Sequence, residues 1–541
     1  MTANIRGARG ARGAVGPHNR SVTVPTVDEP APRIDSRGKG TPLLAGLAKH
    51  AGWSVLGMVA TGAANLFLVG YAIRHLGAFE YGLFAVGAVI TSFLSIADGA
   101  LGLGVMRSAA RELVASSPAD RDVARADIAV SHASYTALSV AALVAATPLA
   151  VLVPHLLSAS PAQSSAVFGT VLLLGGAAAV QLATATSQAI SLGWREYRLT
   201  SIAAATGSLV TLAVAVGTIG RLGVVGLGVA QLAGVLTARV PVFVLVRRRA
   251  QWLPLLPARP RRAEIRRVGA FTLPILLISV GNQLVDLTDV LVISAIASAS
   301  AVGLYRAGTV VPNFAAALLF RAVDTAFPAL ARSDDRRAQE TALSTLTLAT
   351  GCIAGLGFGV MMLQRDGLAA LLTGGSASLT SSVLVIFAFV WLSNATQHCV
   401  GLLLIARGRQ RSYIPFVCVE LLANVALTVV FGRRFGPTGA AVATLVTIVL
   451  SNLLVLPLVV RRELSLNVFR LVWGKGVAAA ALGLAVAAAA SLVVAGLEPR
   501  VRVVAAAAVA LAISAALIGA AGRTRLGRSV RTVLRVAASA H

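Results

Sequence analysis

Two carboxylates lie close together in a long apolar segment of the sequence. Asp286 and Asp289 are three residues apart, so a helix would place both on one face. Asn282 and Gln283 extend the same polar stripe by one helical turn. Carboxylates repel each other where the dielectric constant is low, so one of them should hold a proton or share a cation. The stripe is a candidate site for coupling to protons or sodium ions, and a structural hydrogen-bond cluster is the alternative.

Three further polar or charged side chains lie inside or at the end of apolar segments. Arg239 is eight residues before the basic run at Arg247, about 12 Å along a helix. A guanidinium matches phosphate oxygens and stays charged, so Arg239 is either a phosphate contact or a cation that reaches lipid headgroups. Arg306 is a candidate substrate contact near an outer mouth, or an interface anchor. Glu420, four residues before Asn424, is either a coupling residue or part of an interhelical hydrogen bond.

Motifs for nucleotide hydrolysis or metal catalysis do not occur in the sequence. No Gly-x-x-x-x-Gly-Lys-Ser/Thr pattern is present, so the chain carries no P-loop of its own. The three cysteines have no metal-ligand spacing, and no His-Glu-x-x-His occurs. The sequence therefore predicts no cofactor, no metal and no enzyme. Energy would come from an ion gradient, the membrane potential, a substrate gradient or a partner.

The composition excludes a water-soluble protein. Of 541 residues, 57% are hydrophobic and 13% charged, and the mean hydropathy is +0.81, whereas soluble domains have about 25% charged residues. Apolar segments of helix-spanning length recur fourteen times, without the alternation of strands. Their predicted limits are 52–74, 81–105, 127–154, 164–192, 199–219, 222–246, 268–296, 301–323, 338–364, 377–405, 412–431, 437–460, 473–496 and 500–521.

The distribution of basic residues predicts the orientation of these helices. With the N-terminus placed in the cytoplasm, 38 of the 47 Lys and Arg residues fall in the tails, in the loops after even-numbered spans or at the adjoining span ends. This obeys the positive-inside rule for a multi-pass protein of the cytoplasmic membrane with both termini inside. The net charge of +26 then needs no nucleic-acid partner, because anionic lipids of the inner leaflet are sufficient.

Short matches at a near-constant offset indicate an internal repeat. The segment from Tyr81 to Gly87 is echoed 221 residues later by Val302 to Gly308. Gly223-Val-Val-Gly226 is echoed 213 residues later by Gly436-Pro-Thr-Gly439. Two bundles of six helices, both starting inside, would be related by an axis along the membrane normal. Duplicated bundles are typical of transporters, in which a cleft between them opens alternately to each side.

The repeat sets the predicted domain limits. Residues 1–50 form a disordered basic cytoplasmic tail, 51–249 an N-lobe and 250–267 a basic cytoplasmic linker. Residues 268–462 form a C-lobe, 463–522 two accessory helices, and 523–541 a second basic cytoplasmic tail. The fold class is thus an all-α integral membrane protein of two six-helix bundles plus two extra C-terminal helices.

The sequence resembles the multidrug/oligosaccharidyl-lipid/polysaccharide (MOP) exporter superfamily, and within it the polysaccharide and lipid-linked oligosaccharide flippases. The resembling stretches run in order over about residues 50–465. They are Leu76-Gly77 to Phe84, Asp98 to Gly102, Pro274, Asp289, Val302-Gly303-Leu-Tyr305, Ala326-Phe327-Pro328, Asn424 and Gly436 to Ala441. The resemblance implies a MATE-like two-lobe transporter with a central cavity. Span 1 carries only Arg74 at its outer end, whereas some flippases of this superfamily place several basic residues in the N-lobe, so a polysaccharide-unit flippase fits better than a peptidoglycan-precursor flippase.

The resemblance implies a polyprenyl-pyrophosphate-linked oligosaccharide as substrate. Arg239, Arg306, Asn282 and Gln283 would then bind substrate, and Asp286, Asp289 and Glu420 would couple transport to ions. A polysaccharide polymerase and glycosyltransferases are possible partners. A proton- or sodium-coupled multidrug antiporter of the same superfamily is the alternative, and it would prefer an acidic, aromatic cavity. A membrane-embedded polysaccharide polymerase would be expected to carry its site on a large outer loop, and the outer loops here are short.

Overall fold

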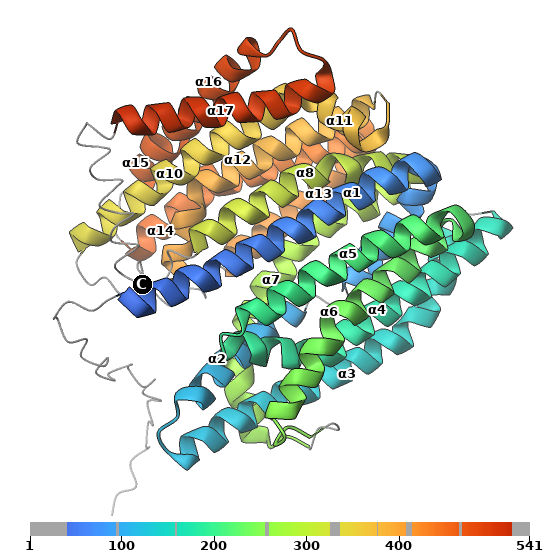
Figure 1. Cartoon of the computed structure of the whole chain (residues 1–541), viewed down its shortest axis with the longest axis vertical. Helices are drawn as coiled ribbons and strands as arrows, with labels where there is room; N and C mark the ends of the chain where they lie inside the picture. Colours follow the sequence, from blue (N-terminus) through green and yellow to red (C-terminus); the bar gives the residue numbers. More distant parts are fainter. Residues whose placement is uncertain are drawn as a thin grey trace, which may run out of the picture.

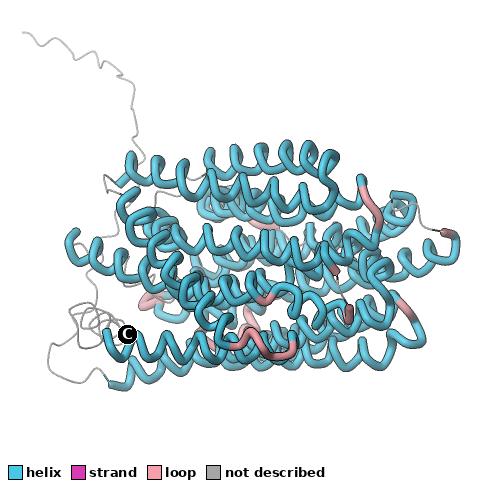
Figure 2. Tube along the Cα trace, turned by 90° about the horizontal axis from the view of Figure 1, so that it is seen from above, coloured by secondary structure: helices cyan, strands magenta, loops and turns pink. Residues whose placement is uncertain are grey.

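The computed structural model describes residues 41–93, 97–156, 160–254, 259–324, 336–375, 377–406, 414–464 and 468–521. These residues are almost entirely helical, with no strand among them, and Figure 2 shows long helices joined by short connections. The helices are α1 (Thr41–Phe93), α2 (Ala97–Val114), α3 (Pro118–Leu156), α4 (Pro161–Gly193), α5 (Tyr197–Leu222), α6 (Val224–Arg249), α7 (Arg262–Ile296), α8 (Ala299–Asp324), α10 (Arg336–Leu363), α11 (Arg365–Thr373), α12 (Ser378–Ala406), α13 (Ile414–Leu450), α14 (Leu456–Leu464), α15 (Val468–Leu471), α16 (Ala478–Val493) and α17 (Pro499–Ala521), with π-helical segments η2 (Ser451–Val455) and η3 (Val472–Val477).

The helices confirm the predicted membrane fold with fourteen transmembrane segments. Eleven described segments are long and apolar enough to cross a membrane. Two of them contain a sharp turn and hold parts of two spans: α1 turns at Gly77 and the segment Ile414–Arg462 turns at Gly436. The last span is α17, in which Val501–Ile513 is apolar. Large apolar side chains such as Phe67, which is 71% exposed, cover the outside of the bundles, as expected of a lipid-facing surface.

Helix boundaries differ from the predicted ones in several places. α1 begins at Thr41, inside the segment predicted as a tail, where Pro42 suits the first turn of a helix. α7 begins inside the predicted linker, and the Glu264 side chain accepts a hydrogen bond from the backbone N–H of Arg261 (2.9 Å). α11 is an additional short helix between the ninth and tenth spans. The tail residues 1–40 and 523–541 lie outside the described residues.

Equivalent glycines in the two halves show the internal repeat in the backbone. Gly223, between α5 and α6, has φ 56° and ψ −136°, and Gly436, 213 residues later, has φ 65° and ψ −154°. A side chain is disfavoured at such positive φ values, so glycine is required at both turns. The same turn thus joins the last two spans of each bundle.

The two bundles form two lobes with an accessory pair at one edge. In the N-lobe, α3 packs on α4, and α6 packs on α4 and α5. In the C-lobe, α12 packs on α8, α10 and α13, and α7 packs on α13. The accessory helix α16 packs on α10, and Figure 1 shows α16 and α17 at the edge of the molecule opposite α3–α6.

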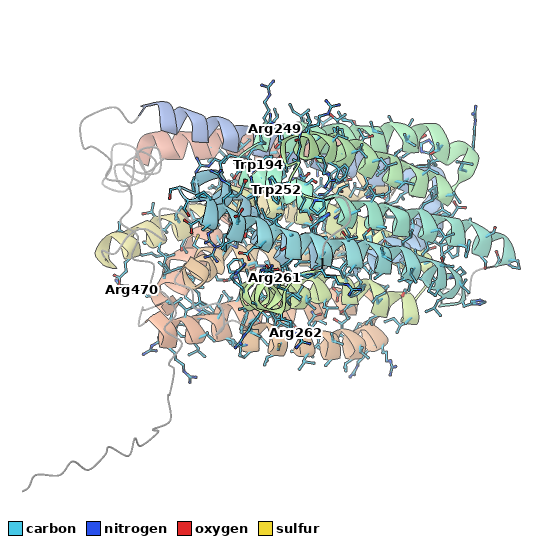
Figure 3. All side chains as sticks on the ribbon, turned by 90° about the horizontal axis from the view of Figure 1, so that it is seen from below. Trp194, Arg249, Trp252, Arg261, Arg262 and Arg470 are labelled. Atoms are coloured by element: carbon cyan, nitrogen blue, oxygen red, sulfur yellow. The ribbon has the colours of Figure 1, made fainter. Side chains whose placement is uncertain are left out.

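Several exposed arginines lie at the helix ends that join the predicted cytoplasmic loops. We call the end that carries the predicted cytoplasmic loops the inner end and the opposite end the outer end. Figure 3 labels Arg249 at the end of α6, Arg261 and Arg262 at the start of α7, and Arg470 in α15, all of them exposed. Trp252, also labelled, lies beneath the guanidinium of Arg125 at 5.0 Å. Aromatic and basic side chains of this kind anchor a protein at the membrane–water boundary.

The lobes contact each other at both ends. At the outer end α1 packs on α8, and a Cβ atom on Gly82 would clash with the carbonyl oxygen of Ala299. The equivalent glycine of the repeat, Gly303, approaches the carbonyl of Ala78 in the same way. At the inner end α7 packs on α2 and α3 of the N-lobe. Any space between the lobes is therefore bounded at its outer end and at its inner end.

Among the described residues, one ion pair joins the lobes at the inner end. Arg267 of α7 donates to the Asp127 carboxylate of α3 from Nε at 2.7 Å, and its Nη2 lies 2.6 Å from the same oxygen. Asp127 is buried, whereas the Arg267 side chain is 44% exposed. Nearby, the Arg107 guanidinium lies 4.7 Å from the Phe271 ring centroid. The inner contact is thus ionic, whereas the outer contact is made by backbone and small residues.

Candidate functional site

A wide cavity of about 660 Å³ lies between the two lobes. Helices α1, α2, α4 and α6 of the N-lobe and α7 of the C-lobe contribute its walls. Eight of the fourteen lining side chains are polar, and none of those fourteen is aromatic. The lining residues are Ala88, Thr91, Ser92, Asp98, Gly99, Leu174, Ala177, Ala178, Gln181, Gln231, Val235, Ser279, Asn282 and Gln283.

The wide cavity is at mid-depth between the two interlobe contacts. On α1, Ala88 is six residues beyond Gly82, which is about 9 Å of helix. On α7, Ser279 is twelve residues beyond Arg267, which is about 18 Å of helix. The cavity is therefore bounded by the glycine contact on the outer side and by the Arg267–Asp127 pair on the inner side.

The predicted substrate-binding residues divide into two groups. Asn282 and Gln283 are exposed on α7, and both line the wide cavity. Arg239 and Arg306 are half-buried and are not among the residues that line it. Arg306 lies in α8, three residues from Gly303 at the outer contact. The structure thus brings the two amides together on the cavity wall but not the two arginines.

Arg239 forms an ion pair with an aspartate that lines the wide cavity. Its Nη2 atom on α6 lies 3.9 Å from Oδ2 of Asp98, which is on α2 and lines the cavity. The Tyr135 hydroxyl of α3 donates to Asp98 Oδ1 (2.9 Å) and lies 2.8 Å from its backbone oxygen. Because the Arg239 and Asp98 side chains are only 19% and 25% exposed, their charges balance each other in a poorly solvated place.

Asp289 of the C-lobe has a different environment from Asp98. Asp289 is 1% exposed in the C-lobe, and its carboxylate accepts a hydrogen bond from the Tyr305 hydroxyl at 2.6 Å. Two threonine hydroxyls of α13 also donate to it, Thr428 at 3.1 Å and Thr444 at 2.8 Å. Among the described residues, no Lys or Arg forms an ion pair with this carboxylate.

The oxygens around Asp289 are suited to a proton or a hard cation. Asn424 donates from Nδ2 to the Thr444 hydroxyl (3.0 Å), while its Oδ1 atom is buried without a hydrogen-bond partner. Oxygen ligands are those that hard cations prefer. In the part of the chain that the structure describes, no three His, Cys, Asp or Glu side chains are grouped as a transition-metal site.

The other two predicted coupling residues are not part of this shell. The side chain of Asp286 lies outside the described ones, although its backbone belongs to α7. Glu420 of α13 instead lines a second, narrow cavity of about 320 Å³ within the C-lobe. Asn282 lines both cavities, so α7 separates the wide cavity from the narrow one.

Sequence reasoning missed most partners of these groups. Thr428 and Thr444 around Asp289 carried no sequence signal, because threonines in apolar helices commonly bond to their own preceding turn. Tyr305 was noted only as part of the repeat and of a resembling stretch, not as a partner of Asp289. Gln181 and Gln231 on the cavity wall were missed too. A search for amides within apolar segments, the signal that singled out Asn282 and Gln283, would have found both.

Comparisons with known proteins agree with this architecture. The family model described as polysaccharide biosynthesis protein matches residues 47–334, more than half of the chain. The structure titled lipid II flippase MurJ, inward closed conformation, has a TM-score of 0.66 at 13% identity and covers 87% of this chain and 100% of that chain. No curated protein sequence matches.

Two transporter structures are similar as well. An inward-facing multidrug resistance MATE family transporter of the MOP superfamily has a TM-score of 0.58 at 16% identity, covering 76% of this chain and 98% of its own. The MATE transporter VcmN of Vibrio cholerae has a TM-score of 0.58 at 14% identity, covering 80% and 99%. At such identities the likeness concerns the fold alone, and it confirms the predicted two-lobe transporter architecture.

Proposed function

Because the chain belongs to the polysaccharide biosynthesis protein family of the MOP superfamily, we propose that it is a flippase for a polyprenyl-pyrophosphate-linked oligosaccharide. It would move this lipid across the cytoplasmic membrane by alternating access, with both termini in the cytoplasm. Anionic lipids would surround its basic inner end, and glycosyltransferases and a polysaccharide polymerase would supply and consume the substrate.

The chemistry of the wide cavity is the observation that carries this proposal. Its wall holds four amide side chains and three hydroxyls, and amides and hydroxyls both donate and accept hydrogen bonds. Sugars present the same mixture of donors and acceptors. An organic cation would be better held by aromatic rings, none of which is among the described lining residues. The wall therefore favours a glycan over a drug-like cation.

Arg239 is the proposed pyrophosphate contact. Asp98, on the cavity wall, holds the Arg239 guanidinium beside the cavity. A pyrophosphate entering from the α2 side would compete with Asp98 for the guanidinium, since arginine forms paired hydrogen bonds with phosphate oxygens. Asn282 and Gln283 would bind the adjoining sugar. Arg306, near the outer contact, would meet the pyrophosphate only when the outer end opens.

Asp289 is the proposed coupling residue. A buried carboxylate without a cationic partner is costly, so it should bind a proton or a sodium ion. Tyr305 connects it to α8, next to the outer contact between α1 and α8. Occupation of Asp289 would thereby favour one packing of α8 over another. Asp286 and Glu420 would act as secondary groups on the route of the ion.

Complementation tests the flippase in a strain that lacks its own copy of the protein. Surface glycan is measured with a lectin, and lipid-linked precursor is measured in extracts. Gln231→Leu, on the cavity wall, should lower surface glycan and raise precursor. Leu236→Ala is the matched control, because Leu236 lies on the same helix and is 40% exposed outside the cavity. Export at the wild-type level by both Gln231→Leu and Arg239→Ala would refute the proposed site, and efflux of ethidium without any effect on glycan would favour the multidrug antiporter.

A further inference from the structure

We propose that the narrow cavity of the C-lobe is the path by which the coupling ion passes between Asp289 and the inner end of the molecule. This inference rests on the proposed coupling role of Asp289. The cavity joins Thr444, which donates to Asp289, to the inner parts of α8, α12 and α13. It is distinct from the wide cavity, and all of its described lining residues belong to the C-lobe.

Many of the lining residues lie on one face of α12. On α12 they occur at helical spacing from Phe387 through Asn394 to Gly401. Gly401 follows Phe387 by fourteen residues, which is about 21 Å of helix, and it is five residues before the inner end of α12. On α13 and η2 the wall runs from Thr444 to Asn452 in the same direction. The cavity thus spans most of the distance from the Asp289 shell to the inner boundary.

The dimensions suit water and small ions. A volume of about 320 Å³ has room for about ten waters, since each water occupies about 30 Å³ in the liquid. An oligosaccharide would not fit, whereas the wide cavity has about twice the volume. The two cavities are therefore suited to different cargoes.

The wall carries polar atoms that still need partners. Gln397 and Asn452 are 5% and 4% exposed and line the cavity, and their Oε1 and Nδ2 atoms make no hydrogen bond in the described part of the chain. Buried polar atoms are almost always hydrogen-bonded, so water or an ion in the cavity would complete these two. Such a wall is expected of a hydrated path and would be costly in a packed core.

The charged groups of the path select cations. Glu420 lines the cavity, and no Lys or Arg is among its described lining residues. At the inner limit, His398 Nε2 lies 3.0 Å from Asp324 Oδ1, and the His398 ring stacks on Phe320 with 4.2 Å between centroids. Asp324 ends α8 and its side chain is 43% exposed. A carboxylate at the mouth and another in the wall attract cations and repel anions.

Cysteine accessibility to Ag⁺ tests the path without measuring transport. In a background with Cys352, Cys399 and Cys418 replaced by serine, single variants Gly401→Cys, Asn394→Cys and Val390→Cys are placed in right-side-out and inside-out vesicles. Ag⁺ is added, and the thiols left free are labelled with a fluorescent maleimide after denaturation. Gly401 tolerates the change, because an added Cβ would meet only Gln397 Oε1 at 3.5 Å.

We expect Ag⁺ added at the inner face to protect the thiols from later maleimide labelling. Protection should be fastest at Gly401→Cys, slower at Asn394→Cys and slowest at Val390→Cys. Phe389→Cys is the matched control on α12, because Phe389 is 44% exposed and is not part of the cavity wall, so Ag⁺ should not protect it from either face. Protection only from the outer face, or none from either face in monodisperse protein that labels fully when denatured, would overturn the path. Inner-face protection combined with an Asp289→Asn variant that still responds to ion gradients would refute the proposed coupling but leave the path in place.

Discussion

Each lobe holds one aspartate that accepts a hydrogen bond from a tyrosine, but the two lobes balance the aspartate charge differently. In the N-lobe, Asp98 accepts a hydrogen bond from Tyr135 and has Arg239 at 3.9 Å. In the C-lobe, Asp289 accepts from Tyr305 and two threonines, with no ion pair among the described residues. A balanced pair is complete without a ligand, whereas a lone buried carboxylate needs a proton or cation. Under the proposed function, this difference favours pyrophosphate contact at Arg239 in the N-lobe and ion coupling at Asp289 in the C-lobe.

Replacing the C-lobe aspartate should have the largest effect on transport. In Asp289→Asn the side chain no longer carries a charge for an ion to balance, so the response to a gradient should be lost. Allosteric coupling is typically worth about 5- to 150-fold, so we expect a loss of this order in gradient-stimulated rate. The measurement is translocation in proteoliposomes with and without an imposed proton or sodium gradient. Asp98→Asn should lower the rate yet keep the stimulation, and full stimulation in Asp289→Asn would contradict the division between the lobes.

Removing one partner of the N-lobe pair should destabilise the fold. Arg239→Ala leaves the Asp98 charge poorly compensated, at a cost of about 1–3 kcal/mol. The double variant Asp98→Asn/Arg239→Ala should regain part of that loss, because no charge is left without a partner. Thermal unfolding in detergent measures both. Strict additivity of the single changes, within about 0.5 kcal/mol, would show that the two side chains do not interact.

The two tyrosines give a smaller but sharper contrast. Tyr305→Phe removes a hydrogen bond to a fully buried carboxylate and should cost about 1.5–3 kcal/mol. Tyr135→Phe should cost only about 1 kcal/mol, because Asp98 keeps Arg239 nearby and is partly solvated. Equal decreases in the free energy of unfolding for the two variants would mean that the two aspartates depend equally on their tyrosine hydrogen bonds.

The smallest effect is expected at the longest of the Asp289 hydrogen bonds. Thr428→Val keeps the shape of the side chain and removes a 3.1 Å hydrogen bond, so it should cost about 0.5–1.5 kcal/mol. The variant should also bind the coupling ion more weakly, which is measured as a higher ion concentration for half-maximal stimulation of transport. An unchanged half-stimulating concentration would exclude Thr428 from the ion shell.

Periodicity and charge made most of the architecture predictable. Fourteen apolar segments and the 213-residue offset follow from local sequence, and the matching turns at Gly223 and Gly436 confirm the repeat. The cavity position of Asn282 and Gln283 also follows, since amides in an apolar helix avoid lipid. The start of α1 at Thr41 was not predictable from hydropathy, because its first turns are not continuously apolar.

The partners of the buried charges could not be predicted in the same way. Thr428 and Thr444 reach Asp289 from 139 and 155 residues away in the sequence. Which of the many threonine hydroxyls turns toward a neighbouring helix depends on helix rotation, and hydropathy does not encode this. The pairing of Arg239 with Asp98 depends likewise on the packing of α6 beside α2.

Reconstituted translocation tests the central claim most directly. Purified protein is placed in vesicles with a fluorescent polyprenyl-pyrophosphate-linked oligosaccharide, and the fraction of label reached by an impermeant quencher is followed over time. The claim predicts that wild-type protein brings inner-leaflet label to the outer leaflet faster than protein-free vesicles do, and that Asn282→Leu/Gln283→Leu slows this exchange. Exchange no faster than in protein-free vesicles, with correctly folded protein in the membrane, would contradict it.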